Sequence, residues 1–210
     1  MKPVYADDSL LVFDKPSGLL AVPGRGIDKQ DCLSARVQAQ YPDALIVHRL
    51  DMATSGLMVM ARGLVAQRAL SQAFAARQVH KRYIAVVAGR LDPPAQDWGT
   101  IDLPLRLDWP NRPLSKVDHQ QGKPSQTRWR VLGHDSDQDT TRVELEPVTG
   151  RSHQLRVHLC ALGHPILGDS LYAPPEVQAR AGRLLLHACE LALPHPLTGE
   201  ARTFGSPVPF

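Results

Sequence analysis

The residues best suited to chemistry lie between two short apolar runs, residues 45–47 and 57–60. Apolar runs of this length, flanked by turn residues, predict buried strands. His48, Arg49 and Asp51 interrupt them. Because burying an unpaired charge is very unfavourable, these side chains should lie at the edge of a sheet or be paired. A carboxylate on a loop between two rigid strands is a candidate catalytic group.

A simpler explanation for Arg49 and Asp51 is a structural ion pair that fixes the loop. The order of residues is more specific than that, because the segment reads H-R-L-D, two residues, then T-S-G. It resembles the signature of the RluA family of pseudouridine synthases, without a departure. The resemblance implies that Asp51 is the catalytic aspartate and that Arg49 fills the gap left by a flipped base or holds the RNA backbone. It also makes His48 and Thr54 candidates for substrate binding.

Residues 80–87 are rich in β-branched side chains and predict a strand, with Tyr83 near its start beside two cations. Taken alone, Tyr83 is a core tyrosine at a strand end. Lys81, Tyr83, Ala85 and Val87 match the family motif K-x-Y-x-A-x-V. The resemblance therefore implies that Tyr83 stacks on the target base.

Residues 150–158 resemble a third family motif, G-R-x-H-Q-L-R-x-H. The turn at Gly150 should deliver Arg151 to the start of a helix that ends at Gly163. The resemblance implies that Arg151 pairs with the catalytic aspartate. His153 and His158 are five residues apart, which is the wrong spacing for one helix face, so no metal site is predicted.

The resemblance implies the pseudouridine synthase fold, an α+β class with a mainly antiparallel mixed sheet, flanking helices and a central active-site cleft. A strand is predicted over residues 183–188, and Leu186 is the candidate for an aliphatic residue that faces the uracil opposite Tyr83. The segment F-D-K-P-S-G-L-L-A-V-P-G, residues 13–24, also matches the family. Residues 1–210 are expected to form a single catalytic domain, with no room for an N-terminal S4 domain.

Other elements follow from residue patterns. Short strands are predicted at residues 10–13 and 19–22, joined by a turn. Asp31 should cap a helix that runs to about Tyr41, and a second helix is predicted over residues 64–79, with Ala66, Leu70, Ala73 and Phe74 as its apolar stripe. Residues 127–132 and 142–146 alternate in polarity and predict an antiparallel hairpin.

The segment from residue 91 to 126 is rich in proline, aspartate and glycine and predicts connections and short strands. Four cations in it are interleaved with Trp109, namely Arg106, Arg112, Lys116 and Lys123. This mixture fits an RNA-facing surface, and a solvated loop would have the same composition. The segment also resembles the dual-specificity branch of the family more than its other branches. The resemblance lies in the sequence D-L-P-L-R-L-D-W-P-N-R-P followed by G-K-P-S-Q-T.

Composition sets broad limits. The chain has 210 residues, is 43% hydrophobic, and carries 24 basic and 21 acidic residues, a net charge of +3. This charge permits nucleic-acid binding without requiring it. The three cysteines are far apart in sequence, and no signal-peptide core or membrane-length apolar run is present. We therefore expect a soluble, cytoplasmic monomer that uses no metal and no cofactor, because the isomerisation needs no redox change or energy input.

Two mechanisms and several functions remain open. Asp51 would attack the sugar carbon or remove a sugar proton, and Arg151 would keep its carboxylate ionised. The expected partners are RNA stem-loops in 23S rRNA, in the tRNA anticodon loop, or in one of these alone. The alternatives are a hydrolase that uses Asp51 as nucleophile or base, and a non-catalytic RNA-binding module or chaperone. The intact set of Asp51, Tyr83 and Arg151 argues against the last.

Overall fold

The computed structural model describes all residues, 1–210, and divides them into two compact units. Unit 1 comprises Met1–Lys81 and Ala188–Pro209, and unit 2 comprises Arg82–His187 together with Phe210. The chain passes from one unit to the other within two of its strands, β5 and β11. Each unit is built around strands whose ladders are antiparallel, and short helices pack on them.

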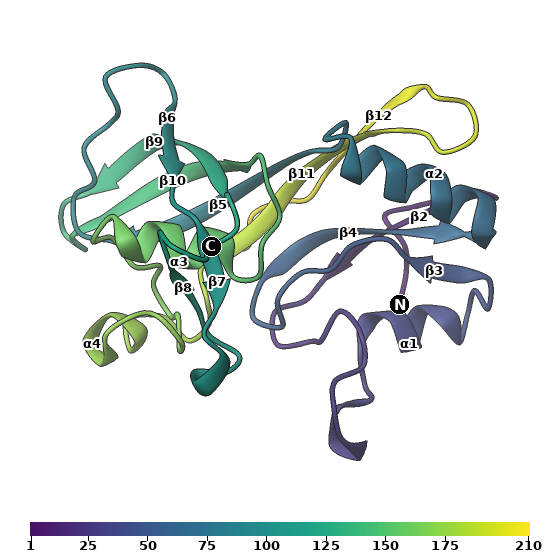
Figure 1. Cartoon of the computed structure of the whole chain (residues 1–210), viewed down its shortest axis with the longest axis horizontal. Coiled ribbons are helices and arrows are strands. Elements are labelled where there is room, and N and C mark those ends of the chain that lie inside the picture. Colours follow the sequence, from purple (N-terminus) through teal and green to yellow (C-terminus); the bar gives the residue numbers. More distant parts are fainter. The chain divides into compact units, whose positions relative to one another are not determined.

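Unit 1 has a sheet in the order β1-β2-β4-β11, in which β3 also pairs with β4 and β12 with β11. Helices α1 and α2 lie on opposite sides of β2, β3 and β4 (Figure 1). The elements are β1 (Tyr5–Ala6), β2 (Leu10–Lys15), a 3-10 turn (Ile27–Lys29), α1 (Leu33–Gln38), β3 (Ala44–Ile46), β4 (Ser55–Arg62), α2 (Gly63–Ala75), β11 (Leu186–Pro194) and β12 (Ala201–Gly205).

The core of unit 1 explains why β2 and β4 consist almost entirely of apolar residues. Both faces of these strands are covered, so nearly all of their residues are buried, and Val12 lies opposite Val59 in the ladder. On α2, Ala66, Leu70 and Ala73 recur at helical spacing and pack with the same face of β4 as Val59. The predicted apolar stripe of this helix is confirmed.

Unit 2 has a sheet in the order β5-β10-β9-β6 and a separate hairpin of β7 and β8. Helix α3 packs against β8, β9 and β10, and can be followed in Figure 1. The elements are β5 (His80–Ala88), β6 (Gly99–Asp102), β7 (Leu105–Leu107), a 3-10 turn (Trp109–Asn111), β8 (Ser115–Val117), β9 (Gln126–Asp135), β10 (Thr140–Pro147), α3 (Gln154–Ala161) and α4 (Pro175–Gln178). The predicted β9–β10 hairpin is confirmed.

The predicted strand at residues 19–22 is wrong, because the backbone there has other partners. Leu20 makes only an isolated bridge to Cys32. The carbonyls of Leu20 and Ala21 accept the N–H groups of Leu33 and Ser34, which begin α1. The segment therefore serves as an acceptor for the first turn of a helix, whose N–H groups have no partner within the helix itself.

The predicted start of α1 is also wrong. Cys32, not Asp31, is the N-cap residue, and its Sγ accepts a hydrogen bond from the Ala35 N–H at 3.4 Å. The Asp31 carboxylate instead forms an exposed ion pair with Arg36 at 2.6 Å. The helix ends at Gln38 rather than near Tyr41.

Three other boundaries also differ from the predictions. Helix α2 ends at Ala75 rather than at residue 79, and Arg77 just beyond it has a left-handed backbone with φ of 58°. Helix α3 begins at Gln154, so that Arg151 lies in the preceding turn. The late strand, expected from residue 183, begins at Leu186.

Candidate active site

The loop between β3 and β4 carries four of the predicted site residues. Arg49 is exposed, His48 and Asp51 are half-buried, and Thr54 is buried. The Thr54 N–H donates to the Asp51 carbonyl at 3.2 Å, which closes a tight turn around the aspartate. The turn fixes the backbone of Asp51 just before the chain enters β4.

A buried lysine holds the residue that follows Asp51. Lys15, at the end of β2, is fully buried, and its ammonium donates to the carbonyls of Leu19 at 2.8 Å, Pro16 at 3.0 Å and Met52 at 3.1 Å. A buried ammonium needs such oxygen partners because it has left water. The cation thereby ties the Asp51 loop to the turn after β2.

Two more hydrogen bonds reinforce this anchor. The Gly18 N–H donates to the Met52 carbonyl at 2.9 Å, and the Ser17 Oγ donates to the Ala53 carbonyl at 2.7 Å. From sequence, residues 15–18 indicate only a turn. The available signal was a lysine at the end of an apolar run, where a charge is unexpected without a specific set of acceptors.

His48 links the loop to its scaffold. Its Nε2 accepts the Val59 N–H at 2.9 Å, and its ring stacks on Phe74 of α2 with centroids 4.9 Å apart. Burial lowers the pKa of His48 to about 3, and the charge of Lys81 lowers it further. The imidazole is therefore neutral at physiological pH, as its acceptor role requires. That His48 also contacts RNA stays a prediction.

Gly56, in the T-S-G part of the motif, is required by packing. Its φ is +113°, a conformation that side chains disfavour, and a Cβ there would lie 2.3 Å from the Ala188 carbonyl oxygen of β11. The close approach of two backbones excludes any side chain. Part of the motif around Asp51 is thus explained by the sheet rather than by chemistry.

Unit 2 carries the other three predicted site residues. Tyr83 on β5 lies opposite Leu145 of β10 in the ladder, and both Tyr83 and Leu186 are more than nine-tenths buried. The Val86 N–H donates to the Leu185 carbonyl at 3.2 Å, so the segment that leads into Leu186 runs beside β5. That Tyr83 and Leu186 enclose a uracil stays a prediction.

Arg151 lies in the turn between β10 and α3, and Gln154 shapes that turn. The Gln154 Oε1 accepts from the Arg151 N–H at 3.0 Å and from the Thr149 Oγ1 at 2.7 Å. Its Nε2 donates to the Gln126 carbonyl and to the Thr127 Oγ1, both at 2.9 Å. A single buried amide therefore joins the turn to β9.

The side chain of Arg151 is exposed. Its Nε and Nη2 each lie 3.4 Å from the Pro124 carbonyl oxygen, which steers the guanidinium toward the segment after β8. Sequence analysis did not single out Gln154, although it belongs to the motif. The prediction that Arg151 pairs with Asp51 stays a prediction.

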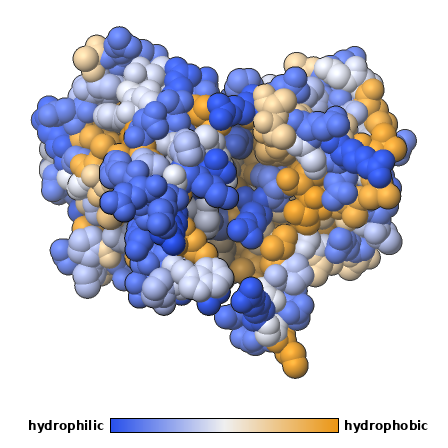
Figure 2. Space-filling view, in the orientation of Figure 1, coloured by the Kyte–Doolittle hydropathy of each residue, from blue (hydrophilic) through white to orange (hydrophobic).

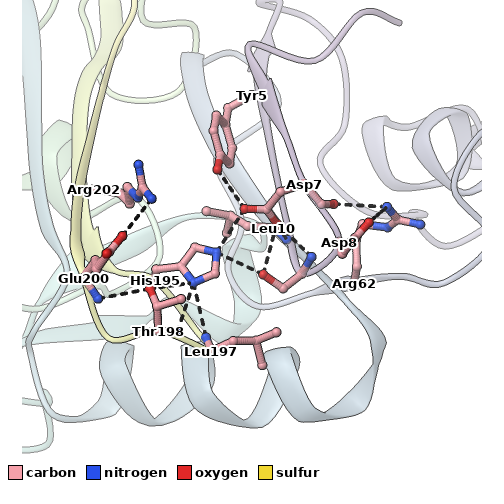
Figure 3. A network of polar contacts seen from close by, with 11 residues as sticks. Tyr5, Asp7, Asp8, Leu10, Arg62, His195, Leu197, Thr198, Glu200 and Arg202 are labelled. Atoms are coloured by element: carbon pink, nitrogen blue, oxygen red, sulfur yellow. Dashed lines mark hydrogen bonds and ion pairs between the residues drawn. The ribbon is translucent and has the colours of Figure 1, made fainter.

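Unit 1 contains a second cluster of catalytic residue types, formed by Asp7, Ser9 and His195. Figure 3 labels Asp7 and His195. The His195 Nε2 lies 2.9 Å from the Asp7 Oδ2 and 3.1 Å from the Ser9 Oγ. Its Nδ1 accepts the Thr198 N–H at 3.2 Å, which leaves the proton on Nε2. That nitrogen has no lone pair to take a proton from Ser9, so the cluster is not a hydrolytic triad.

The cluster instead joins the turn before β2 to the hairpin of β11 and β12. Burial opposes the charge of Asp7, but the N–H groups of Ser9 and Leu10, the Tyr5 hydroxyl and His195 donate to it and hold its pKa well below the usual range. The structure holds no group of three or more His, Cys, Asp or Glu side chains placed to bind a metal ion. None of its helices is long and apolar enough to cross a membrane.

Comparison with known proteins decides the family. A family model described as RNA pseudouridylate synthase matches residues 9–161. The chain belongs to the RNA pseudouridine synthase family. Its members are isomerases, and the predicted fold class and enzyme class are confirmed. The motif around Asp51 lies in unit 1, the motif around Arg151 lies in unit 2, and the motif around Tyr83 begins at the last residue of the first segment of unit 1 and continues into unit 2.

Curated relatives and solved structures agree. The dual-specificity RNA pseudouridine synthase RluA of Escherichia coli K12 is 52% identical over 207 residues, which cover 99% of this chain and 93% of that protein. The Yersinia pestis protein of the same name is also 52% identical, over 99% and 96%. The structure of human RNA pseudouridylate synthase domain containing 1 superposes with a TM-score of 0.81 at 32% identity, over 99% of this chain and 83% of that one.

Proposed function

We propose that this protein converts specific uridines in 23S rRNA and in the anticodon loop of tRNA into pseudouridine. The observation that carries the proposal is the 52% identity, over 99% of the chain, to relatives named as dual-specificity enzymes. We further propose that the enzyme is a cytoplasmic monomer whose two units together form one catalytic domain.

In the proposed reaction the target base leaves the RNA stack. The stacking and pairing lost in this step make binding less favourable by roughly a few kcal/mol. Arg49, exposed on the loop before Asp51, would fill the gap or hold the backbone. The bond between C1′ and N1 of uridine breaks, and a bond between C1′ and C5 forms. The hydrogen on C5 is lost as a proton and N1 gains one, so atoms balance without a cofactor.

Asp51 would act as an ionised carboxylate, either on the sugar carbon or on a sugar proton. Arg151 would favour that ionised form, since a guanidinium stays charged at any working pH. Tyr83 and Leu186 would hold the detached uracil between them, and Thr54 would help to bind the nucleotide. Support for these roles comes from the three intact motifs and from the fixed backbone at Asp51 and Arg151.

The test compares wild type with Asp51→Asn on tRNA and 23S rRNA transcripts, with pseudouridine as the readout. We expect wild type to modify both RNAs and the variant to lose about a thousandfold or more in rate, because the substitution removes the reacting group and little else. Asp28→Asn removes an exposed carboxylate of the same unit and should leave the rate unchanged.

Three outcomes would contradict parts of the proposal. An active, folded Asp51→Asn variant would make Asp51 structural. Modification of only one of the two RNAs would leave a tRNA-only or rRNA-only enzyme. Binding of both RNAs without product would favour a non-catalytic RNA-binding protein.

A further inference from the structure

A pocket of unit 2 lies beside Arg151 and is separate from the residues assigned above to the uracil. It has a volume of about 510 Å³, within the range of pockets that bind small ligands. Leu105 and Ser115 of the β7–β8 hairpin are buried and belong to its lining, together with the exposed Trp109. Each wall is part of the same unit.

The charged residues of the pocket are all cations. Arg106, Lys123 and Arg151 line it, and no carboxylate does. Lys123 makes no ion pair, and the Arg151 guanidinium has only the Pro124 carbonyl as a polar partner. Arg106 is partly balanced by Asp118 at 3.4 Å and also donates to Gln121. The pocket therefore offers positive charge to an anion.

Two carboxylates close in sequence to the lining residues, Asp108 and Asp118, are engaged by the hairpin itself. Asp118 accepts the N–H groups of Gln120 at 3.0 Å and Gln121 at 2.8 Å. Asp108 pairs with Lys116 at 3.2 Å and accepts from Asn111. Their negative charges are thus used to hold the turns, and the surface over β7 and β8 is mostly hydrophilic (Figure 2).

Trp109 gives the pocket an aromatic surface. The side chain is 63% exposed, which is unusual for a tryptophan, and the Arg112 guanidinium lies 3.8 Å from the ring centroid. Arg112 makes no ion pair, so the exposed pair of ring and cation carries a net positive charge. An indole backed by a guanidinium is the kind of surface on which unpaired bases stack.

The hairpin is held rigidly to the turn that carries Arg151. The Ser115 N–H donates to the Tyr172 hydroxyl at 2.8 Å, and the same hydroxyl lies 2.7 Å from the Nδ1 of His153, two residues after Arg151. The Asp118 N–H donates to the Pro104 carbonyl at 2.9 Å. A ligand in the pocket would therefore be placed relative to Arg151 by fixed elements.

We propose that this pocket binds one unpaired nucleotide of the substrate RNA other than the target uridine, with its base stacked on Trp109 and its phosphate held by Lys123. The inference rests on the proposed function, since it concerns how the same RNA is held. It assigns to Trp109 a role in recognising a single-stranded loop. A fully paired stem offers no free base to this surface.

The experiment measures the dissociation constant of a tRNA anticodon stem-loop for wild type, Trp109→Ala and Trp109→Phe. We expect Trp109→Ala to weaken binding about tenfold, as the loss of one stacked base does, and Trp109→Phe to restore most of it. Stem-loops that lack one loop base at a time then locate the nucleotide. One of these shortened stem-loops should bind wild type about tenfold more weakly than the complete stem-loop does. The same stem-loop and the complete one should bind Trp109→Ala equally well.

Lys123→Ala tests the phosphate. It should lower the slope of the logarithm of affinity against the logarithm of salt concentration by about one, the amount expected for one lost phosphate contact. Arg90→Ala removes a cation of the same unit that pairs with Asp92 and does not line the pocket, and it should leave the slope unchanged.

The outcomes separate this inference from the proposed function. If wild type forms pseudouridine but Trp109→Ala binds within about twofold of it, the inference is wrong and the function stands. If only the Lys123→Ala slope changes, the pocket attracts the RNA by charge alone and the stacking is refuted. If wild type forms no pseudouridine in either RNA but the missing-base effect depends on Trp109, the function fails and the pocket remains an RNA site.

Discussion

The two loops that carry the proposed catalytic charges are held in opposite ways. The Asp51 loop is fixed by Lys15, Ser17 and Gly18, which lie more than thirty residues earlier in the chain. The turn of Arg151 is fixed by Gln154, three residues later in the same motif. The first depends on a buried ammonium and the second on a neutral amide. Damage to the first anchor should therefore spread through unit 1, whereas damage to the second should stay local.

The largest effect is expected for Lys15→Met. This change leaves the carbonyls of Pro16, Leu19 and Met52 without their shared donor, and we expect the free energy of unfolding to fall by about 3 kcal/mol. Chemical denaturation measures it. Hydrogen exchange should become faster along residues 10–24 and 51–60 together. Lys29→Met, at an exposed position, is the control and should change stability by less than about 0.5 kcal/mol. A Lys15→Met variant as stable as wild type would remove the contrast between the loops.

A smaller loss of stability is expected for Gln154→Leu. The substitution keeps the side-chain volume but removes the hydrogen bonds to Thr149, Arg151, Gln126 and Thr127. We expect the free energy of unfolding to fall by about 2 kcal/mol. Exchange should accelerate near residues 147–155 and remain unchanged around Asp51. The rate at saturating RNA should fall about tenfold, because Arg151 loses its fixed position. Gln178→Leu, exposed on α4, provides the control. Faster exchange throughout both units would show that this anchor is not local.

The smallest effect concerns pH and His48. Because the pKa of His48 in the folded protein is about 3, against an ordinary value near 6.5, the unfolded chain binds a proton between these values that the folded protein does not. Stability should therefore fall as the pH drops below 6.5. The complete pKa difference would lower the stability by about 2 kcal/mol at pH 5. We expect about 1 kcal/mol, because His48 as a residue is only partly buried.

The measurement is the unfolding free energy of wild type and His48→Asn at pH 7 and pH 5. The difference between the two proteins should be about 1 kcal/mol more favourable to the variant at pH 5, since asparagine cannot titrate. His119→Asn, at an exposed position, should show no such change. Equal pH dependence in wild type and His48→Asn would mean that the imidazole is protonated at no cost in the folded protein.

The sequence was sufficient to predict which motifs carry the site residues. It did not predict which side chains and backbone groups anchor those motifs. Short apolar runs located β2 and β4, and periodicity located α2 and the β9–β10 hairpin, because the apolar residues of each must be buried. Residues 19–22 have the same apolar character, yet their carbonyls serve α1 and Lys15 instead of a ladder. Hydrophobicity alone does not distinguish these two uses of a short apolar run.

Side-chain anchors are invisible to the same reasoning for a physical reason. Lys15 and Gln154 act through backbone groups, which every residue carries, so no partner type marks them in the sequence. The cap of α1 was misassigned for a related reason, since aspartate is the commoner cap and Cys32 is a weak acceptor. The site residues themselves were found by motif, and the chemistry assigned to Asp51, Tyr83 and Arg151 awaits the experiments above.

The close approach of Gly56 to Ala188 has a consequence for reading natural variation in such sequences. A single added methyl group at this position would push apart two neighbouring strands of unit 1, and the displaced strand begins four residues after Asp51. A homologous chain that keeps the aspartate but replaces this glycine would therefore have to rebuild the junction of β4 and β11 to present the carboxylate in the same way. An intact active-site motif would therefore not be sufficient to assign the same activity to such a chain.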